Sequence, residues 1–177
     1  IASTSCAAGP ALEGGNITHG MRGAQGAIDH VHISDDLEVR YSTINGSRPR
    51  GICGSAVVDC LAEAFRTGLL DRKGKFNLDL GHPRVREIDG VLQLVLADEA
   101  ESATGGTVSI TQKDIGEVLN AKAAMYVGAI TLMEEMGVRR EDLESILLAG
   151  AFGNYISPRS AMSLGMFPEV PLERVLQ

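Results

Sequence analysis

The chain has 177 residues, which suits one domain or one lobe of a larger protein, and its hydrophobic fraction of 44% is enough to build a core. Its net charge of −7 and its aromatic content of 4% argue against nucleic acid as a partner, because phosphates repel an acidic surface and base stacking needs aromatic rings. The sequence contains no apolar run long enough to span a membrane and no visible signal peptide, so we expect no membrane partner and a cytoplasmic location.

The first third of the chain predicts two strands followed by a helix. Residues 1–27 are rich in glycine and other small residues, a composition typical of tight turns and close backbone approaches. Residues 28–44 alternate in part between apolar and polar side chains and predict two short strands around a polar turn. The GICGS motif at 51–55 then begins a helix that ends near Thr67, with Ser55 as its expected N-cap.

The middle of the chain predicts a strand pair and the longest helix. Residues 84–96 alternate around an Asp-Gly turn, as expected for two antiparallel strands. After a polar loop, Thr111 is the expected cap of a helix over 112–136, and Asp114 stands at the capping-box position three residues later.

The last part of the chain has the order strand, glycine turn, helix. Residues 145–149 are a short, continuous apolar run, which predicts a fully buried parallel strand. The glycines of 150–153 then turn the chain, and Pro158 begins a short helix that runs through Leu164. We therefore predict an α/β fold with a mixed, partly parallel sheet flanked by helices, across which the 112–136 helix packs.

Two segments are candidate ligand sites, each with a structural alternative. The glycine turn at 150–153 follows a predicted strand, where open α/β sheets bind ligands, but a tight strand–helix turn explains it equally well. Lys122 interrupts the apolar stripe of its helix, so its side chain snorkels to solvent, pairs with a carboxylate or faces a ligand cleft. The snorkelling alternative is the more common one.

Two further glycine motifs carry weaker signals. Glu13 beside Gly14 and Gly15 is suited to a ribose hydroxyl or a metal-bound water, and equally to a solvated turn. The GICGS motif suits an anion at a helix N-terminus, although helix capping alone also accounts for it.

The cysteines and histidines add no catalytic or metal site to this interpretation. The three cysteines form neither a disulfide framework nor a metal-binding spacing, so we expect buried, reduced thiols. His30 and His32 share one face of a predicted strand, but no third or fourth ligand is apparent nearby. No nucleophile is paired with a base in the sequence, so no catalytic residue is assigned.

Six motifs in a fixed order resemble those of the reductive activators of corrinoid proteins. The resemblance runs from about residue 2 to Pro168, and several motifs in order are far more specific than any one of them. The motifs are AAGPALEGG at 7–15, GMR and GAI within 20–28, GICGS at 51–55, ITQKDI at 110–115, AKAA at 121–124 and LAGAFGNYI at 148–156.

The resemblance implies a ribonuclease-H-like lobe of the actin, heat-shock chaperone and sugar kinase (ASKHA) superfamily. Members of the family couple ATP hydrolysis to the return of cob(II)alamin to cob(I)alamin, which implies nucleotide, with Mg²⁺, and a corrinoid protein as partners. Residues 1–177 are expected to be one C-terminal lobe of the ATPase domain. The phosphate loops and a [2Fe-2S] ferredoxin domain are expected upstream of Ile1, so this stretch alone is not expected to hydrolyse ATP, and a homodimer stays open.

The resemblance also implies nucleotide contacts. The glycine turn resembles one that packs on adenosine, although Ala151 stands where relatives commonly carry a second glycine, which leaves open whether its methyl weakens that contact. The 112–136 helix resembles one that contacts ribose or adenine, and the Glu-Gly-Gly segment resembles the glycine pair that follows the second phosphate loop. The implied nucleotide-binding residues are Glu13, Gly14, Gly15, Lys122, Gly150, Phe152 and Gly153.

Two other interpretations remain open. A small-molecule kinase or acyl-enzyme activator of the same superfamily would use the same lobe, and an upstream set of ferredoxin-type cysteines would decide against it. A non-catalytic docking or dimerisation module would use the glycine loops for structure only, and equal ATP binding by the full-length protein and by its Gly150→Val variant would favour that interpretation.

Overall fold

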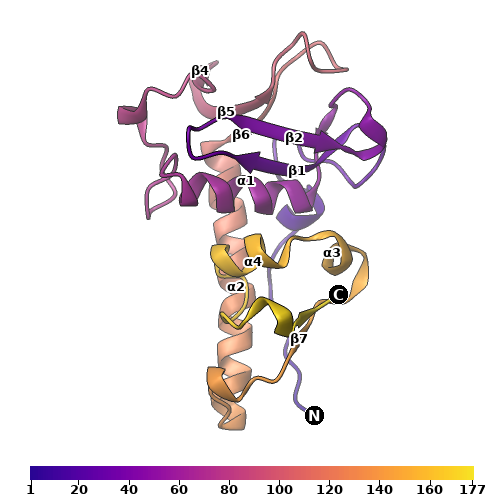
Figure 1. Cartoon of the computed structure of the whole chain (residues 1–177), viewed down its shortest axis with the longest axis vertical. Helices are drawn as coiled ribbons and strands as arrows, with labels where there is room; N and C mark the ends of the chain where they lie inside the picture. Colours follow the sequence, from indigo (N-terminus) through magenta and orange to yellow (C-terminus); the bar gives the residue numbers. More distant parts are fainter.

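Three small sheets and four α-helices make up the fold in a computed structural model, which describes residues 1–177 apart from the side chain of Ala151 (Figure 1). The predicted α/β class is confirmed, but the strands form separate sheets instead of one. Short 3-10 helices occur at Ala11–Glu13 (η1), Ile44–Gly46 (η2), Leu78–Leu80 (η3), Arg140–Asp142 (η4) and Leu172–Arg174 (η5).

The first sheet has the strand order β2-β1-β3. β1 (Ala27–Ile33) pairs antiparallel with β2 (Val39–Thr43), as predicted, and parallel with β3 (Gly51–Ile52). β3 leads into helix α1 (Gly54–Arg66), which packs along β1. β1 buries Ile28, Val31 and Ile33 in this arrangement, whereas the side chains of His30 and His32 between them stay exposed.

The start of α1 differs from the sequence prediction by two residues. Cys53 has extended backbone angles and is the N-cap, whereas Ser55 lies inside the first turn. The Ser55 hydroxyl donates to the backbone carbonyl of Asp29 at 2.8 Å, so it binds the helix to β1 instead of capping it.

The second sheet is antiparallel, with the order β4-β5-β6. β4 (Val85–Ile88) and β5 (Val91–Ala97) form the predicted strand pair, and β6 (Val108–Thr111) runs on into helix α2 (Gln112–Met136). The predicted capping box of α2 is confirmed: Thr111 Oγ1 accepts from the Asp114 backbone N–H at 3.1 Å, and Asp114 accepts from the Thr111 backbone N–H at 2.9 Å.

The prediction that the 112–136 helix packs across a sheet holds only for its first half. Its buried residues, Asp114, Ile115, Val118 and Ala121, all lie in its first half. The second half extends beyond both three-stranded sheets, toward the end of the molecule that carries β7 (Figure 1).

The predicted strand at 145–149 forms, but the prediction that it is fully buried is wrong. β7 (Ile146–Leu147) pairs in parallel with β8 (Val175–Leu176), and Leu147 is 72% exposed. A two-stranded sheet buries only the face that meets another layer, and the Leu147 side has no such layer within the described structure.

The segment after β7 is mostly helical. Residues 150–153, expected to be an open glycine turn, form the start of helix α3 (Gly150–Tyr155), and the predicted second helix follows as α4 (Pro158–Leu164). The side-chain amide of Gln177 donates to the backbone carbonyls of Gly153 at 2.7 Å and Ile156 at 2.8 Å, which fastens the last residue of the chain to this segment.

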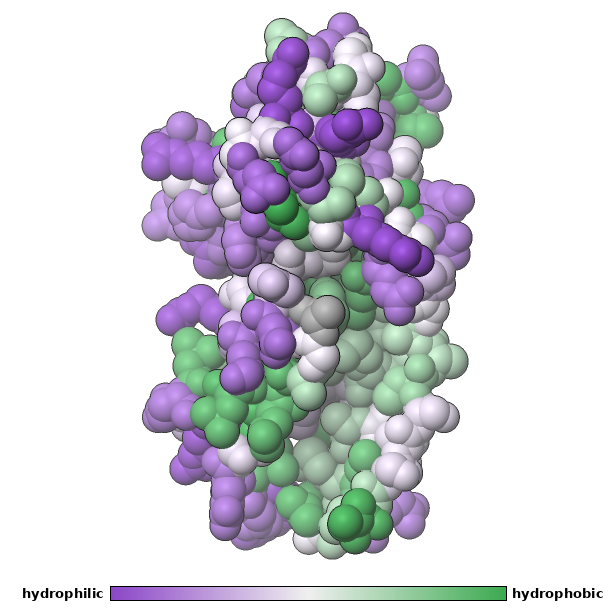
Figure 2. Space-filling model, turned by 90° about the vertical axis from the view of Figure 1, so that its right-hand side faces the viewer, coloured by the Kyte–Doolittle hydropathy of each residue, from purple (hydrophilic) through white to green (hydrophobic). Residues whose placement is uncertain are grey.

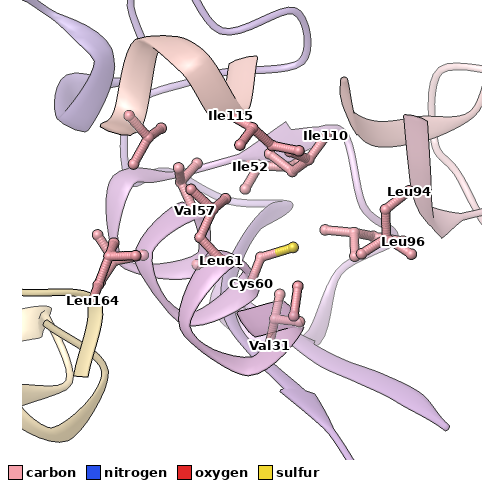
Figure 3. Close-up of a cluster of buried hydrophobic side chains, with 14 of the residues drawn as sticks. Val31, Ile52, Val57, Cys60, Leu61, Leu94, Leu96, Ile110, Ile115 and Leu164 are labelled. Atoms are coloured by element: carbon pink, nitrogen blue, oxygen red, sulfur yellow. The ribbon is translucent and has the colours of Figure 1, made fainter. Parts of the chain in front are cut away.

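The core lies between the first two sheets, α1 and the first part of α2, and α4 covers one end of it (Figure 3). Ile52, Leu61, Leu94 and Ile115, which come from four different elements, are almost completely buried there. Within the described residues, no helix combines the length and the apolar character that crossing a membrane requires.

Candidate functional site

A cleft of about 730 Å³ opens at the N-terminal end of α1, and we call it the α1 cleft. It brings together segments that are far apart in the sequence, namely η1, the loop after it, β1, the turn after β2, the start of α1, and α3. Its lining residues are Leu12, Glu13, Met21, Arg22, Gly23, Asp29, His30, Thr43, Ile44, Asn45, Cys53, Gly54, Ser55, Phe152 and Tyr155.

Gly54 allows the two sides of this cleft to approach each other. A Cβ built at Gly54 would lie 1.9 Å from the Leu12 carbonyl oxygen and 3.0 Å from the Phe152 ring. Any larger residue at this position would push η1 and α3 away from α1. Gly54, the second glycine of the GICGS motif, therefore sets the shape of the α1 cleft.

Of the Glu-Gly-Gly segment, only Glu13 lines the cleft. Gly14 has a φ of +83°, and a Cβ there would lie 2.7 Å from the Met21 backbone nitrogen. A Cβ at Gly15 would lie 2.7 Å from Pro10 Cβ. Both glycines therefore serve close packing of the chain on itself, and the contacts that the resemblance implies for them stay predictions.

Of the LAGAFGNYI motif, Phe152 and Tyr155 line the cleft, whereas Gly150 and Gly153 do not. Gly150 has a φ of +85° with open space around it, and a Cβ at Gly153 would lie 2.9 Å from the Leu148 carbonyl carbon. The prediction about the methyl of Ala151 concerns a side chain outside the described structure.

Lys122 lines a different cavity, a groove of about 510 Å³ between α2 and the segment after α4, which we call the α2 groove. Tyr126, Glu134, Phe167 and Glu169 are among its other lining residues. The structure therefore brings Glu13 and Phe152 together and places Lys122 apart from them.

His30, one wall of the α1 cleft, forms a histidine–carboxylate pair with Asp59, which the sequence did not predict. His30 Nδ1 lies 2.9 Å from Asp59 Oδ2, and the Asp59 side chain is only 6% exposed. The other carboxylate oxygen, Oδ1, is buried and has no hydrogen-bond partner within the described structure.

His32 makes a similar pair one helical turn further along α1. Its Nδ1 lies 3.0 Å from Glu63 Oε2. Burial raises the pKa of Glu63, but hydrogen bonds from Arg66 and from the Ile33 backbone N–H, with the nearby charges, outweigh burial and hold the pKa below its usual value. The two pairs have a signal in the sequence, because histidines two apart on a strand match carboxylates four apart on the following helix.

The thiols are only partly as predicted. Cys53 and Cys60 are buried, and burial raises the pKa of the Cys60 thiol to about 12, so it stays protonated. Cys6 is exposed, contrary to expectation, because it lies in the extended N-terminal segment beside α2. No group of three or more metal-ligating side chains occurs among the residues that the structure describes.

Comparison with known proteins shows what the chain is similar to. Residues 1–177 match a family model described as the C-terminal domain of RACo, the ASKHA domain. The chain is 40% identical over 178 residues to the corrinoid activation enzyme RamQ of Eubacterium limosum, a match that covers 96% of this chain and 29% of that protein. It is 29% identical over 189 residues to the Co(II) methylated amine-specific corrinoid protein reductase of Methanosarcina barkeri, covering 95% of this chain and 31% of that protein.

A solved structure, the reductive activator for corrinoid, iron-sulfur protein, has the same architecture. The match has a TM-score of 0.91 at 39% sequence identity and covers 97% of this chain and 27% of that one. The chain thus spans less than a third of the length of each of these proteins.

Proposed function

The chain belongs to the family of the C-terminal ASKHA domain of RACo, which confirms the expected ribonuclease-H-like fold, and from this premise we propose that it is part of an ATP-dependent reductive activator of a corrinoid protein. The activator would return cob(II)alamin to cob(I)alamin in a corrinoid methyltransferase system. The names of the relatives, a corrinoid activation enzyme and a reductive activator, support this proposal.

The α1 cleft is the proposed contribution of this chain to nucleotide binding. The observation that carries this assignment is that Glu13 and Phe152, from two separate family motifs, line one cleft with the first turn of α1. The rings of Phe152 and Tyr155 suit a purine. The free N–H groups at the start of α1 and the guanidinium of Arg22 suit phosphate oxygens.

The proposal places Mg²⁺ and the [2Fe-2S] cluster outside residues 1–177, on the facing lobe and on a ferredoxin domain. Nucleotide held between two lobes would favour a closed arrangement, provided that it binds this arrangement more tightly than the open one. The corrinoid protein would then dock on the closed form, so that ATP hydrolysis is coupled to an unfavourable electron transfer.

We expect Phe152→Ala to weaken ATP binding by the full-length protein about 5- to 10-fold, because one aromatic wall of the cleft is lost. Isothermal calorimetry with ATP measures this directly. Leu147→Ala is a suitable control, because Leu147 is exposed and lies outside the cleft. If the full-length protein bound no ATP, the docking-module alternative would replace this proposal.

The same titration tests Lys122, which lines the α2 groove outside the α1 cleft and whose proposed nucleotide contact rests on the resemblance alone. Lys122→Ala should weaken binding by ~1–2 kcal/mol if the amine makes a charged hydrogen bond to the nucleotide. Lys113→Ala, an exposed lysine of the same helix, is the matched control. Unchanged affinity in Lys122→Ala would leave Lys122 as a surface lysine, and ATP binding without corrinoid reduction would favour the kinase or acyl-enzyme alternative.

A further inference from the structure

We propose that His30, held by Asp59, accepts the proton of the water that attacks the terminal phosphate of a nucleotide in the α1 cleft. This inference rests on the proposed function, because it needs the α1 cleft to be the nucleotide site. It assigns His30 as a catalytic residue and Asp59 as a positioning residue.

The buried carboxylate of Asp59 fixes the protonation of the His30 ring. The Asp59 carboxylate is almost completely buried, its Oδ1 has no partner within the described structure, and its Oδ2 lies 2.9 Å from His30 Nδ1. A buried carboxylate is stable only where a hydrogen-bond donor or a positive charge compensates it. The imidazole is the group that does so, which assigns the ring proton to Nδ1.

The other ring nitrogen of His30, Nε2, is left as the acceptor of the ring. With Nδ1 protonated and directed at Asp59, a neutral His30 carries its lone pair on Nε2. Nε2 accepts no hydrogen bond within the described structure, and His30 is one of the walls of the α1 cleft. An acceptor nitrogen backed by a buried carboxylate is the arrangement that general bases use, because the carboxylate stabilises the imidazolium that forms.

His30 shares the α1 cleft with the first turn of α1, because Gly54 and Ser55 are also among its lining residues. Asp59, which holds His30, lies five residues after Gly54, or about 7.5 Å further along the helix axis at a rise of 1.5 Å per residue. A terminal phosphate bound by the first turn of α1 would therefore lie in the same cleft as His30.

The reaction balances without any additional reactant. The water oxygen bonds to the terminal phosphorus while the bond from that phosphorus to the bridging oxygen breaks, and the bonding electron pair leaves on the nucleoside diphosphate. One proton of the water passes to His30 Nε2 and then to the phosphate product or to solvent, which restores the neutral ring.

His32 provides an internal control, because it makes the same kind of pair on the same strand face. Its partner Glu63 is satisfied by Arg66 and by the Ile33 N–H, and His32 is absent from the walls of the described α1 cleft. A histidine paired only for stability should behave like His32.

The test compares H30Q, D59N and H32Q in the full-length protein by ATP calorimetry and by the pH profile of ATP turnover at saturating ATP. We expect H30Q to lower kcat at least ~100-fold, to leave ATP affinity within about threefold, and to remove the decline of the rate at low pH. D59N should move that decline to lower pH, because loss of the carboxylate disfavours the imidazolium. H32Q should match the wild type.

Other charged or ionisable residues that line the α1 cleft are Glu13 from η1, Arg22 from the loop after it, Asp29 on β1 and Cys53 at the start of α1. Their contributions remain in all three variants, so the differences of H30Q and D59N from H32Q report on the pair.

The outcomes separate this inference from the proposed function. A wild-type protein that binds no ATP would overturn both. Normal ATP binding by an H30Q variant that keeps its rate and its pH profile would overturn the role of His30 alone. A parallel loss of ATP affinity and rate would make His30 a binding group and would also overturn it. If H30Q does not fold, the pH profile of ATP turnover by D59N is the deciding measurement. A rate that declines at the same pH in D59N as in the wild type would count against the proposal.

Discussion

The carboxylate of Asp114 is completely buried and is shared between two parts of the chain. Besides capping α2, it accepts hydrogen bonds from the backbone N–H of Thr18 at 2.9 Å and from the Thr18 hydroxyl at 3.0 Å. Thr18 belongs to the glycine-rich segment that also carries Glu13 to the α1 cleft. One side chain thus caps the longest helix and fixes a wall of the candidate site.

We expect Asp114→Ala to lower the free energy of unfolding by ~2–4 kcal/mol, because half of the capping box is lost and the donors of Thr18 and Thr111 are left unpaired. Urea denaturation followed by circular dichroism measures this. Asp142→Ala removes a comparable cap from the exposed helix η4 and should cost less than ~1 kcal/mol. Equal losses in the two variants would contradict the role assigned to Asp114.

At the scale of elements, α1 is the helix that contributes most to the candidate site. It is buried along most of its length, its first turn lines the α1 cleft, and Asp59 holds His30 from the next turn. η1 and α3 can approach the start of α1 closely because Gly54 has no side chain.

Replacing two helical glycines, Gly54 and Gly116, by alanine should change the free energy of unfolding in opposite directions. Gly54→Ala should lower the free energy of unfolding by ~1–3 kcal/mol, because the new methyl collides with the Leu12 carbonyl. Gly116→Ala, in α2, meets nothing within 4 Å and should raise it by up to ~1 kcal/mol through helix propensity. Thermal unfolding of both variants provides the comparison, and a neutral Gly54→Ala would show that η1 yields easily.

The elements that the sequence predicted correctly are those with local signals. The strand pairs β1–β2 and β4–β5 follow from alternation around turns, and α2 from its capping box. The exposure of β7 could not be predicted in this way, since its partner β8 lies near residue 176 and the burial of a strand depends on the layers around it. Likewise, Glu13 and Phe152 meet only through tertiary packing, as do His30 and Asp59.

At the scale of the whole molecule, packing is uneven along the long axis. The core lies around α1 and the first part of α2, whereas the end that carries the second half of α2 and β7 has much apolar surface (Figure 2). The large apolar side chains exposed on α2 and β7 are Tyr126, Val127, Met136 and Leu147.

Hydrogen exchange should reveal this unevenness within a single helix. We expect backbone amides of residues 126–136 to exchange at least ~10-fold faster than those of 115–121, because few buried contacts oppose local opening of the second half of α2. Deuterium uptake by mass spectrometry resolves the two segments. Uniform protection along α2 would mean that its second half is covered in solution.

The bonds of Gln177 and the pairing of β7 with β8 have a mechanical consequence for the α1 cleft. Phe152 stands on α3, and α3 is anchored by a strand pair of two residues and by the two hydrogen bonds that the Gln177 amide donates. Such a short, isolated strand pair is only marginally stable by itself. The aromatic wall of the cleft therefore depends on a short segment that these few hydrogen bonds and the packing of Phe152 and Ile156 on the core hold in place, whereas the opposite wall, α1, is buried along most of its length.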